Sequence, residues 1–179
     1  SPDLFVAECD ESDGSIILYH PRIAILNNIA LDHKPVTELL PIFMQYLKQS
    51  AQLILNIDHI PIYDHIFPHF EGNAITFSIG NPEAHFCARN ITPSPDGITA
   101  EICGRGVGDA HEEGGLKLEL QVPGYHNIAN AMAAMAACYT IGIPAAQSAA
   151  ALAGFKGVAR RLQIIKKYNK ISIIDDFAH

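Results

Sequence analysis

Short, uninterrupted apolar runs that end in polar residues organise the first third of the chain. Residues 4–7 and 23–26 are such runs, and continuous apolarity is typical of strands that are buried on both faces. Residues 53–57, apolar except for Asn56, predict a third buried strand. Between the second and third runs, residues 39–47 carry apolar side chains at helical spacing. This alternation of strand, helix and strand predicts an α/β fold with a mostly parallel sheet flanked by helices.

The middle of the chain has a different pattern. Four short strand-like runs, at residues 74–79, 85–91, 98–103 and 116–122, are separated by turns rich in proline and glycine. Such a pattern predicts a small antiparallel edge or insert. The glycine-rich segment 104–108 has neither the lysine of a phosphate-binding loop nor G-x-G-x-x-G spacing, so it is interpreted as a turn.

Helical structure returns near residue 125. An alanine-rich stretch, which follows Pro123 and Gly124 and ends at Gly142, predicts one helix, with Asn127 as a candidate N-cap. Residues 145–152 predict a second helix. Residues 161–165 and 170–174 then read as two strands on either side of a short turn.

Composition narrows the range of functions. The 179 residues are 49% hydrophobic, and 12 Lys and Arg against 19 Asp and Glu give a net charge of −7. Nucleic-acid and membrane-surface binders need a basic face, so neither partner is expected. The four cysteines form no C-x-x-C pair, which favours free thiols in a reducing, cytoplasmic compartment. Both ends of the chain lie close to apparent strands, so we expect a piece of a larger enzyme.

Polar side chains follow the first two predicted strands. Glu8, Asp10, Glu11 and Asp13 form an acidic island after the first, and Asp32-His33 follows the second. Ligands of parallel sheets bind at the carboxyl ends of strands, and Mg²⁺ takes one or two carboxylates. A histidine ligand is less usual for Mg²⁺. The alternatives are a solvated acidic loop and a His33 that caps a helix.

The first turn of the alanine-rich helix carries a second candidate site. His126, Asn127 and Asn130 are spaced so that they can share one helix face. An asparagine amide reads adenine by donating to a ring nitrogen and accepting from the exocyclic amine, and an imidazole can stack on a base. The alternative is a helix with a polar first turn and no ligand.

Three further groups are weaker candidates. Arg160-Arg161 after a glycine turn suits phosphate charge, although a salt bridge and surface exposure would also explain the pair. Asp175-Asp176 at a strand end could accept from ribose hydroxyls or cap a following helix. His59, His65 and His69 could bind zinc, but Pro61 and Pro68 break any helix that would align them.

Five of these groups, taken in order, resemble the central domain of the Mur ligases, the ATP-dependent amide-forming enzymes of peptidoglycan synthesis. The matching segments are Glu8-Cys-Asp-Glu-Ser-Asp13, Asn28-Ile-Ala-Leu-Asp-His33, Gly124-Tyr-His-Asn-Ile-Ala-Asn-Ala131, Phe155-Lys-Gly-Val-Ala-Arg-Arg161 and Asp175-Asp-Phe-Ala-His179. Each motif is weak alone, but together they span nearly the whole chain.

The resemblance implies roles for these residues. Glu8 and His33 would bind Mg²⁺, and His126, Asn127 and Asn130 would surround the adenine of ATP. Arg160 or Arg161 would face the phosphates, and Asp176, with Asp175, would hold the ribose. Glu8, His33 and Arg160 would then serve catalysis. Residues 1–175 would be the central domain, and residues 176–179 would begin the link to a further domain.

The implied reaction is phosphoryl transfer from ATP to a muramate carboxylate, followed by attack of an amino group on the acyl phosphate. The acidic island is most similar to the branch that joins L-alanine to UDP-N-acetylmuramate. Asp175-Asp-Phe-Ala-His179 and Ala24-Ile-Leu-Asn-Asn28 also resemble the recycling branch, which attaches a murein tripeptide. A nonenzymatic nucleotide-binding module of the same fold is the third hypothesis.

One departure from the family matters for activity. The chain contains no G-x-x-G-K-[ST] segment, so the loop that cradles phosphates in the family is absent from it. In the family that loop precedes the acidic island, so we expect a central domain truncated on its N-terminal side and inactive alone. A sheet that lacks the strand before that loop has an open edge, which predicts a homodimer through that edge.

Overall fold

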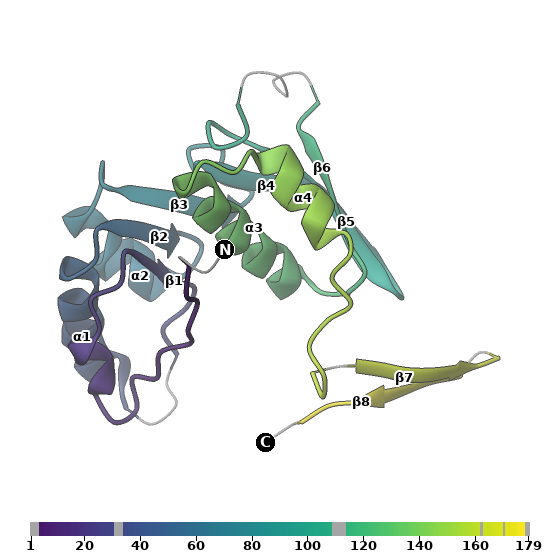
Figure 1. The fold of residues 1–179 in the computed structure, drawn as a ribbon, viewed down its shortest axis with the longest axis horizontal. Helices are drawn as coiled ribbons and strands as arrows, with labels where there is room; N and C mark the ends of the chain where they lie inside the picture. Colours follow the sequence, from purple (N-terminus) through teal and green to yellow (C-terminus); the bar gives the residue numbers. More distant parts are fainter. Residues whose placement is uncertain (1–3, 31–33, 109–113, 162, 170, 178–179) are drawn as a thin grey trace.

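A six-stranded sheet forms the centre of the molecule (Figure 1). The computed structural model describes residues 4–30, 34–108, 114–161, 163–169 and 171–177. Within the sheet the strands lie side by side in chain order. They are β1 (Ile23–Leu26), β2 (Gln52–Asn56), β3 (Ala74–Ile79), β4 (Phe86–Ser94), β5 (Gly97–Cys103) and β6 (Leu116–Leu120).

One face of the sheet is covered by α1 (Val36–Lys48) and by α2 (Ile60–His65), with the short 3₁₀ segments η1 (Ser15–Leu18) and η2 (Phe67–His69) beside them. Leu39 and Leu47 of α1 are almost fully buried there against Leu53 and Leu55 of β2. Ile54, between those two leucines, packs in the cluster on the opposite face. The uninterrupted apolar run of β2 is therefore explained by burial on both faces.

The opposite face is covered by α3 (Tyr125–Thr140) and α4 (Ala145–Leu152). Ile128, Met132 and Met135 of α3 are completely buried against the sheet. The alanines between them let the helix axis lie close to the strands, because a methyl group needs little space. Figure 1 shows α3 running along the sheet and α4 following it towards β6.

The sheet changes direction at β4. β1 to β4 are parallel, and β4–β5 and β5–β6 are antiparallel. The predicted mostly parallel α/β sheet is confirmed, and so is its antiparallel edge. The expectation that β3 belongs to that antiparallel region is wrong, because β3 pairs in parallel with both of its neighbours, whereas β4 is parallel to β3 and antiparallel to β5.

A six-residue connection, residues 80–85, joins the parallel strands β3 and β4, where a dozen or more residues are usual. Side chains hold this connection in place. The Asp58 carboxylate accepts hydrogen bonds from the Ser78 hydroxyl and from the Ile79 N–H at the end of β3. The Asn81 N–H in turn donates to the Ser78 hydroxyl oxygen at 3.1 Å.

The C-terminal strands form a separate hairpin. β7 (Gln163–Tyr168) pairs with β8 (Ile171–Asp175) in an antiparallel two-stranded sheet. Asn169 adopts a φ of 54° in the turn between them, as asparagine tolerates. Figure 1 shows this hairpin apart from the main sheet, on the far side of the segment that follows α4.

Residues 4–7 do not form the predicted strand. Phe5 and Val6 are each 92% exposed, and no described strand pairs with this segment. An apolar run becomes a strand only where a neighbouring strand completes its hydrogen bonds, and β1 pairs only with β2 among the described strands. All four cysteines are free thiols, as expected. No helix among the described residues has the length and apolarity needed to cross a membrane.

The turn at residues 104–108 requires glycine at its first position. Gly104 has a φ of 101°, and a Cβ there would lie 2.7 Å from the carbonyl oxygens of Ala84 and His85. Gly104→Ala should therefore lower the free energy of unfolding by about 3 kcal/mol, through backbone strain together with this clash. Gly108→Ala, whose φ is 84° with nothing within 4 Å, is the matched control and should cost only about 1 kcal/mol. Urea unfolding measures both, and equal losses would contradict the prediction.

His85 should make stability depend on pH. Its Nδ1 accepts the Thr76 N–H at 3.2 Å, and burial, followed by the Arg105 charge, lowers the pKa of His85 below its ordinary 6.5. The folded chain thus binds this proton less readily than the unfolded chain does. The contribution of neutral His85 is complete above about pH 6.5 and is lost as the pH falls through the lowered value.

His85→Asn keeps an acceptor without a titrating ring, so its unfolding free energy should fall less than that of the native chain between pH 7 and pH 5. Urea unfolding across that range measures the difference. His69→Asn, at an exposed position, should leave the native slope unchanged. A native slope in the His85 variant would show that another group is responsible.

Candidate functional site

The end of β1 and the start of α3 meet at one edge of the sheet. Asn27 directly follows β1, and Asn130 lies in the second turn of α3. The Asn27 Nδ2 donates a hydrogen bond of 2.6 Å to the Asn130 Oδ1. This contact places the polar residues of α3 at the carboxyl end of a parallel strand, where open α/β sheets bind their ligands.

Asn27 is incompletely satisfied at this position. Its own Oδ1 is buried and accepts no hydrogen bond from the described residues. A buried acceptor without a donor costs about 1–3 kcal/mol, so native proteins usually satisfy such atoms unless the geometry serves another purpose. The Asn27–Asn130 pair therefore marks this edge as a candidate ligand site on structural grounds alone.

His126 lies over the residue that immediately precedes α3. Gly124 is the N-cap, with a φ of 106°, and a Cβ there would lie 2.6 Å from the Cε1 of His126 and 2.9 Å from its Nδ1. Only glycine leaves room for the ring in this position. The imidazole is exposed, so it can offer a flat surface or a hydrogen bond to a ligand.

Asn127 has a different structural role from the one predicted. It lies inside the first turn of α3 and is not the N-cap, because Gly124 occupies that position. Its Nδ2 donates to the Pro123 carbonyl oxygen at 2.7 Å, and its backbone N–H donates to the Gly124 carbonyl oxygen at 3.0 Å. Asn127 thus closes the junction between loop and helix and holds Gly124 in place under His126.

The acidic island is a compact turn. The Asp10 carboxylate accepts the Ser12 N–H at 2.7 Å, and the Asp13 carboxylate accepts the Ser15 N–H at 2.8 Å. The latter bond lowers the pKa of Asp13 below its ordinary value. Both aspartates therefore shape the backbone, and Glu8 remains an exposed carboxylate just before the turn.

The turn is anchored to α1 by residues on either side of it. Cys9 packs at the border of the cluster beneath α1, and burial, with the nearby Cys9 thiol as a second cause, raises the pKa of Tyr46 to about 12. Gln49 Nε2 donates to the carbonyl oxygens of Ile17 and Tyr19, at 2.9 Å each. Glu8 is thus next to a fixed segment although its own side chain is exposed.

Of the two predicted magnesium ligands, Glu8 and His33, only Glu8 lies among the described residues. Asp32 and His33 lie outside the described residues, so the pairing of Glu8 with His33 stays a prediction. Within the described part of the chain, no three His, Cys, Asp or Glu side chains are grouped so that they could hold a metal ion. His59, His65 and His69 all belong to that part, so the zinc interpretation is wrong.

Arg160 is brought together with the C-terminal motif. Its guanidinium lies 5.1 Å from the ring centre of Phe177, and its carbonyl oxygen accepts the Phe177 N–H at 2.7 Å. Arg160 also has a φ of 62°, and its N–H donates to the Gln163 Oε1. Asp175 ends β8 opposite Gln163, and Asp176 follows it. Arg161 is exposed.

Two groups of predicted site residues therefore emerge. His126, Asn127 and Asn130 lie on α3 at the edge of the sheet, whereas Arg160, Arg161, Asp175 and Asp176 lie at the base of the hairpin. Figure 1 shows this hairpin apart from α3. The structure thus places Arg160 beside the Asp175–Phe177 segment. The hairpin residues and the α3 residues do not lie next to each other.

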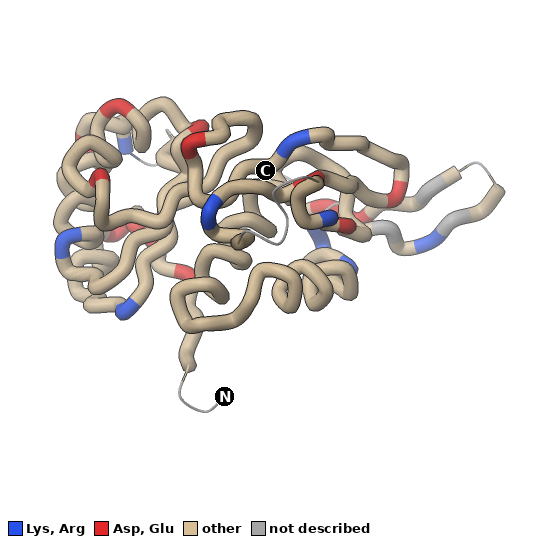
Figure 2. The backbone as a smooth tube through the Cα atoms, turned by 90° about the horizontal axis from the view of Figure 1, so that it is seen from above, with Lys and Arg blue, Asp and Glu red and all other residues tan. Residues whose placement is uncertain are grey.

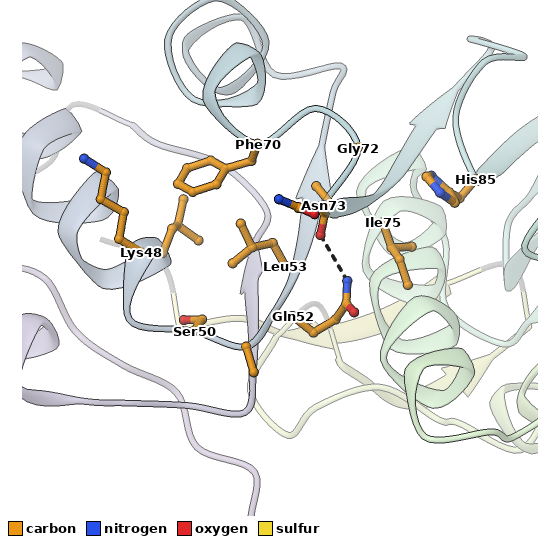
Figure 3. A pocket seen from close by; sticks show the side chains of 12 residues that line it. Lys48, Ser50, Gln52, Leu53, Phe70, Gly72, Asn73, Ile75 and His85 are labelled. Atoms are coloured by element: carbon orange, nitrogen blue, oxygen red, sulfur yellow. Dashed lines mark hydrogen bonds between the residues drawn. The ribbon is translucent and has the colours of Figure 1, made fainter.

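The described cavities lie elsewhere. One of about 550 Å³ is lined by the end of α1 and by the first residues of β2 and β3, and the bond from Gln52 Nε2 to the Asn73 carbonyl oxygen crosses it (Figure 3). A second, of about 410 Å³, lies between α2 and the β3–β4 connection. The first borders the amino ends of the strands, so it is unrelated to the Asn27–Asn130 edge.

Charge gives no support to a nucleic-acid interface. Figure 2 shows basic and acidic positions interspersed along the described backbone, with no continuous basic stripe. Asn27 is the site residue that the sequence interpretation missed. Its signal was its place directly after a buried strand, but only the fold shows that Asn130, 103 residues later, is its partner.

The chain is similar to known proteins over most of its length. A family model described as the Mur ligase middle domain matches residues 3–138. The UDP-N-acetylmuramate–L-alanine ligases of Synechococcus sp. (strain JA-3-3Ab) and Pelotomaculum thermopropionicum are each 36% identical over 99% of the chain. The chain spans about a third of the length of these relatives, 34% and 38% respectively.

Solved structures show the same fold. The UDP-N-acetylmuramate–alanine ligase of Thermotoga maritima superposes with a TM-score of 0.77 at 24% identity, over 95% of this chain and 38% of its own. A murein peptide ligase of Psychrobacter arcticus gives 0.64 at 26% identity, over 92% and 33%. The chain therefore belongs to the Mur ligase family, and residues 3–138 correspond to its middle domain.

Proposed function

We propose that this chain is the nucleotide-binding middle domain of an ATP-dependent ligase that joins L-alanine to UDP-N-acetylmuramate in the cytoplasm. The observation that carries the proposal is the 36% identity, over nearly the whole chain, to ligases named for that reaction. Residues 1–175 act as the middle domain of a longer polypeptide, and residues 176–179 lead on towards a further domain.

The residues of the α3 edge fit an adenine base. Asn130 offers a carboxamide that can donate to a ring nitrogen and accept from an exocyclic amine. The His126 ring provides a flat surface above Gly124, and Asn127 fixes the junction below it. The unmatched Oδ1 of Asn27 supports a ligand at this edge, because the protein alone leaves its polar groups incompletely paired.

Glu8 is suited to be a ligand of a magnesium ion. Mg²⁺ needs one or two carboxylates and completes its shell with water and phosphate oxygens, and Glu8 is an exposed carboxylate beside a fixed turn. His33 is proposed as its partner. A Mg²⁺ ion held by Glu8 would offset negative charge on the phosphates of ATP.

The hairpin residues are proposed to complete the nucleotide site. Arg160 or Arg161 would offset phosphate charge, and Asp176, together with Asp175, would accept from the ribose hydroxyls. Because the hairpin lies apart from α3 (Figure 1), these roles require it to approach the sheet edge. ATP then transfers its γ-phosphoryl group to the muramate carboxylate and leaves as ADP, and the amino group of L-alanine attacks the resulting acyl phosphate and displaces phosphate. The protein contributes positioning and charge stabilisation.

A second candidate is the ligase that attaches a murein tripeptide to UDP-N-acetylmuramate. The likeness to the Psychrobacter arcticus murein peptide ligase favours it, together with the Asn27-Asn28 pair noted in the sequence. A nonenzymatic Mur-like module and a homodimer through the edge of β1 stay predictions.

The decisive experiment measures phosphate release by the full-length protein with Mg·ATP and UDP-N-acetylmuramate. We expect release with L-alanine and none with the L-Ala-γ-D-Glu-diaminopimelate tripeptide. Release with the tripeptide only would select the recycling reaction. Silence with both, from a folded protein, would favour the nonenzymatic module. The 179-residue chain alone should release no phosphate, because it carries no phosphate-binding loop.

Glu8→Ala in the full-length protein should lower kcat at least about 100-fold, because the metal ion loses a ligand near the transferring phosphoryl group. The melting temperature should stay within about 2 °C of native, since an exposed side chain contributes little to stability. Glu71→Ala removes an exposed carboxylate in the turn before β3 and should retain native kcat. Equal kcat values for the two variants would remove Glu8 from the metal site.

A further inference from the structure

We propose that Asn27 is a positioning residue that fixes the orientation of the Asn130 carboxamide and thereby makes the site selective for adenine over 6-oxopurines. The inference rests on the proposed function, because it takes Asn130 as the residue that meets the base. Asn27 belongs to a different element of the fold from Asn130. We assign to Asn27 the selectivity for ATP over ITP and GTP.

The Asn27–Asn130 hydrogen bond is asymmetric. A carboxamide has an oxygen and an amino group of almost the same size on either side of one carbon, so packing alone does not decide which way it faces. A donor on one side does decide it. Asn27 Nδ2 donates to Asn130 Oδ1 at 2.6 Å, and the covalent geometry of the amide then turns the Asn130 amino group away from Asn27.

The backbones of Asn27 and Asn130 are both held rigidly. Asn27 directly follows β1, whose Ala24 and Leu26 are buried in the sheet. Asn130 lies one residue before Ala131 and two before Met132 on α3, and both of these are buried against the strands. Neither backbone can shift without disturbing the core. The pair therefore acts between two fixed points, and only side-chain rotation could alter its geometry.

Asn27 carries an unfavourable feature at this position. The Asn27 Oδ1 is buried and has no hydrogen-bond partner among the described residues. A side chain retained only for stability would be expected to satisfy both of its polar atoms. Asn27 instead satisfies its amino group alone, and that group is the one that orients Asn130. The arrangement favours a role in holding Asn130 over a role in stabilising the fold.

The hydrogen-bonding edge of the base distinguishes adenine from 6-oxopurines. Adenine presents the N6 amine as a donor and N7 as an acceptor, and a fixed asparagine matches both. Hypoxanthine and guanine present acceptors at both O6 and N7, so the oxygen of a fixed carboxamide would face O6 and repel it. A carboxamide that is free to rotate can turn its amino group towards O6 and so avoid this repulsion. Selectivity for adenine therefore depends on the restraint that Asn27 supplies.

The test is the ratio of kcat/KM for ATP to kcat/KM for ITP, measured on the full-length ligase. Asn27→Ala releases Asn130 and should lower this ratio about tenfold, with a smaller loss in kcat/KM for ATP itself. Asn27→Asp keeps the size of the side chain but replaces its donor with an acceptor. It should attract the Asn130 amino group, turn the carboxamide over and lower the ratio further, mainly through weaker use of ATP.

Asn73→Ala is the matched control, because Asn73 is an exposed asparagine just before β3 whose hydrogen bonds to the described residues use only its backbone. It should leave the ratio at its native value. Thermal melting of all three variants shows whether each is folded. If Asn27→Ala does not fold, the near-isosteric Asn27→Asp provides the test. A purely structural role for Asn27 would lower kcat/KM for both nucleotides by the same factor.

The outcomes separate the inference from the proposed function. An active native ligase whose ATP-to-ITP ratio does not change in the folded Asn27 variants would overturn the inference alone. A folded native protein that releases no phosphate with Mg·ATP, UDP-N-acetylmuramate and either amino substrate would overturn the proposed function and the inference with it. A ratio that falls in Asn27→Ala and falls further in Asn27→Asp would establish Asn27 as the residue that sets base selectivity.

Discussion

The packing of α3 across one face of the sheet is the constraint on which the other features of this domain depend. Ile128, Met132 and Met135 fill the space above the strands, and the alanines between them allow the helix to lie close. This packing fixes where the first two turns of α3 project. Asn130 consequently meets Asn27 at the carboxyl edge of β1, and His126 covers Gly124 at the helix start. A looser helix would leave the same residues without a defined edge to face.

The fold followed from local patterns because each pattern has a direct physical cause. β2 is uninterrupted in its apolarity because both its faces are covered, and α4 occupies the predicted residues 145–152. Residues 4–7 show the limit of such reasoning. Their apolarity resembles that of β1, but a strand also needs a neighbour to complete its hydrogen bonds, and composition says nothing about neighbours. The parallel direction of β3 and β4 was missed because their six-residue connection is too short for an ordinary crossover.

The candidate site was predictable where its residues are close in sequence and not where they meet across the fold. His126, Asn127 and Asn130 share two turns of one helix, so their spacing identified them together. The internal role of Asn127, which donates to Pro123 and does not cap the helix, depends on backbone geometry that a sequence leaves open. Asn27 contacts Asn130 across 103 positions, and no local pattern connects the two. The residues of the hairpin were identified as a motif, but their separation from α3 is a property of the three-dimensional arrangement.

The strict chain order of the strands has a consequence for how the domain forms during synthesis. Every strand of the main sheet pairs with the strand that comes next in sequence, so the sheet can grow by adding one neighbour at a time as the chain emerges. The helices that cover one of its faces come early, at residues 36–48 and 60–65, whereas α3 comes only after β6. A nascent chain that ends near residue 122 would thus have a nearly complete sheet with one apolar face uncovered. Until α3 is synthesised, that apolar face would stay exposed to water.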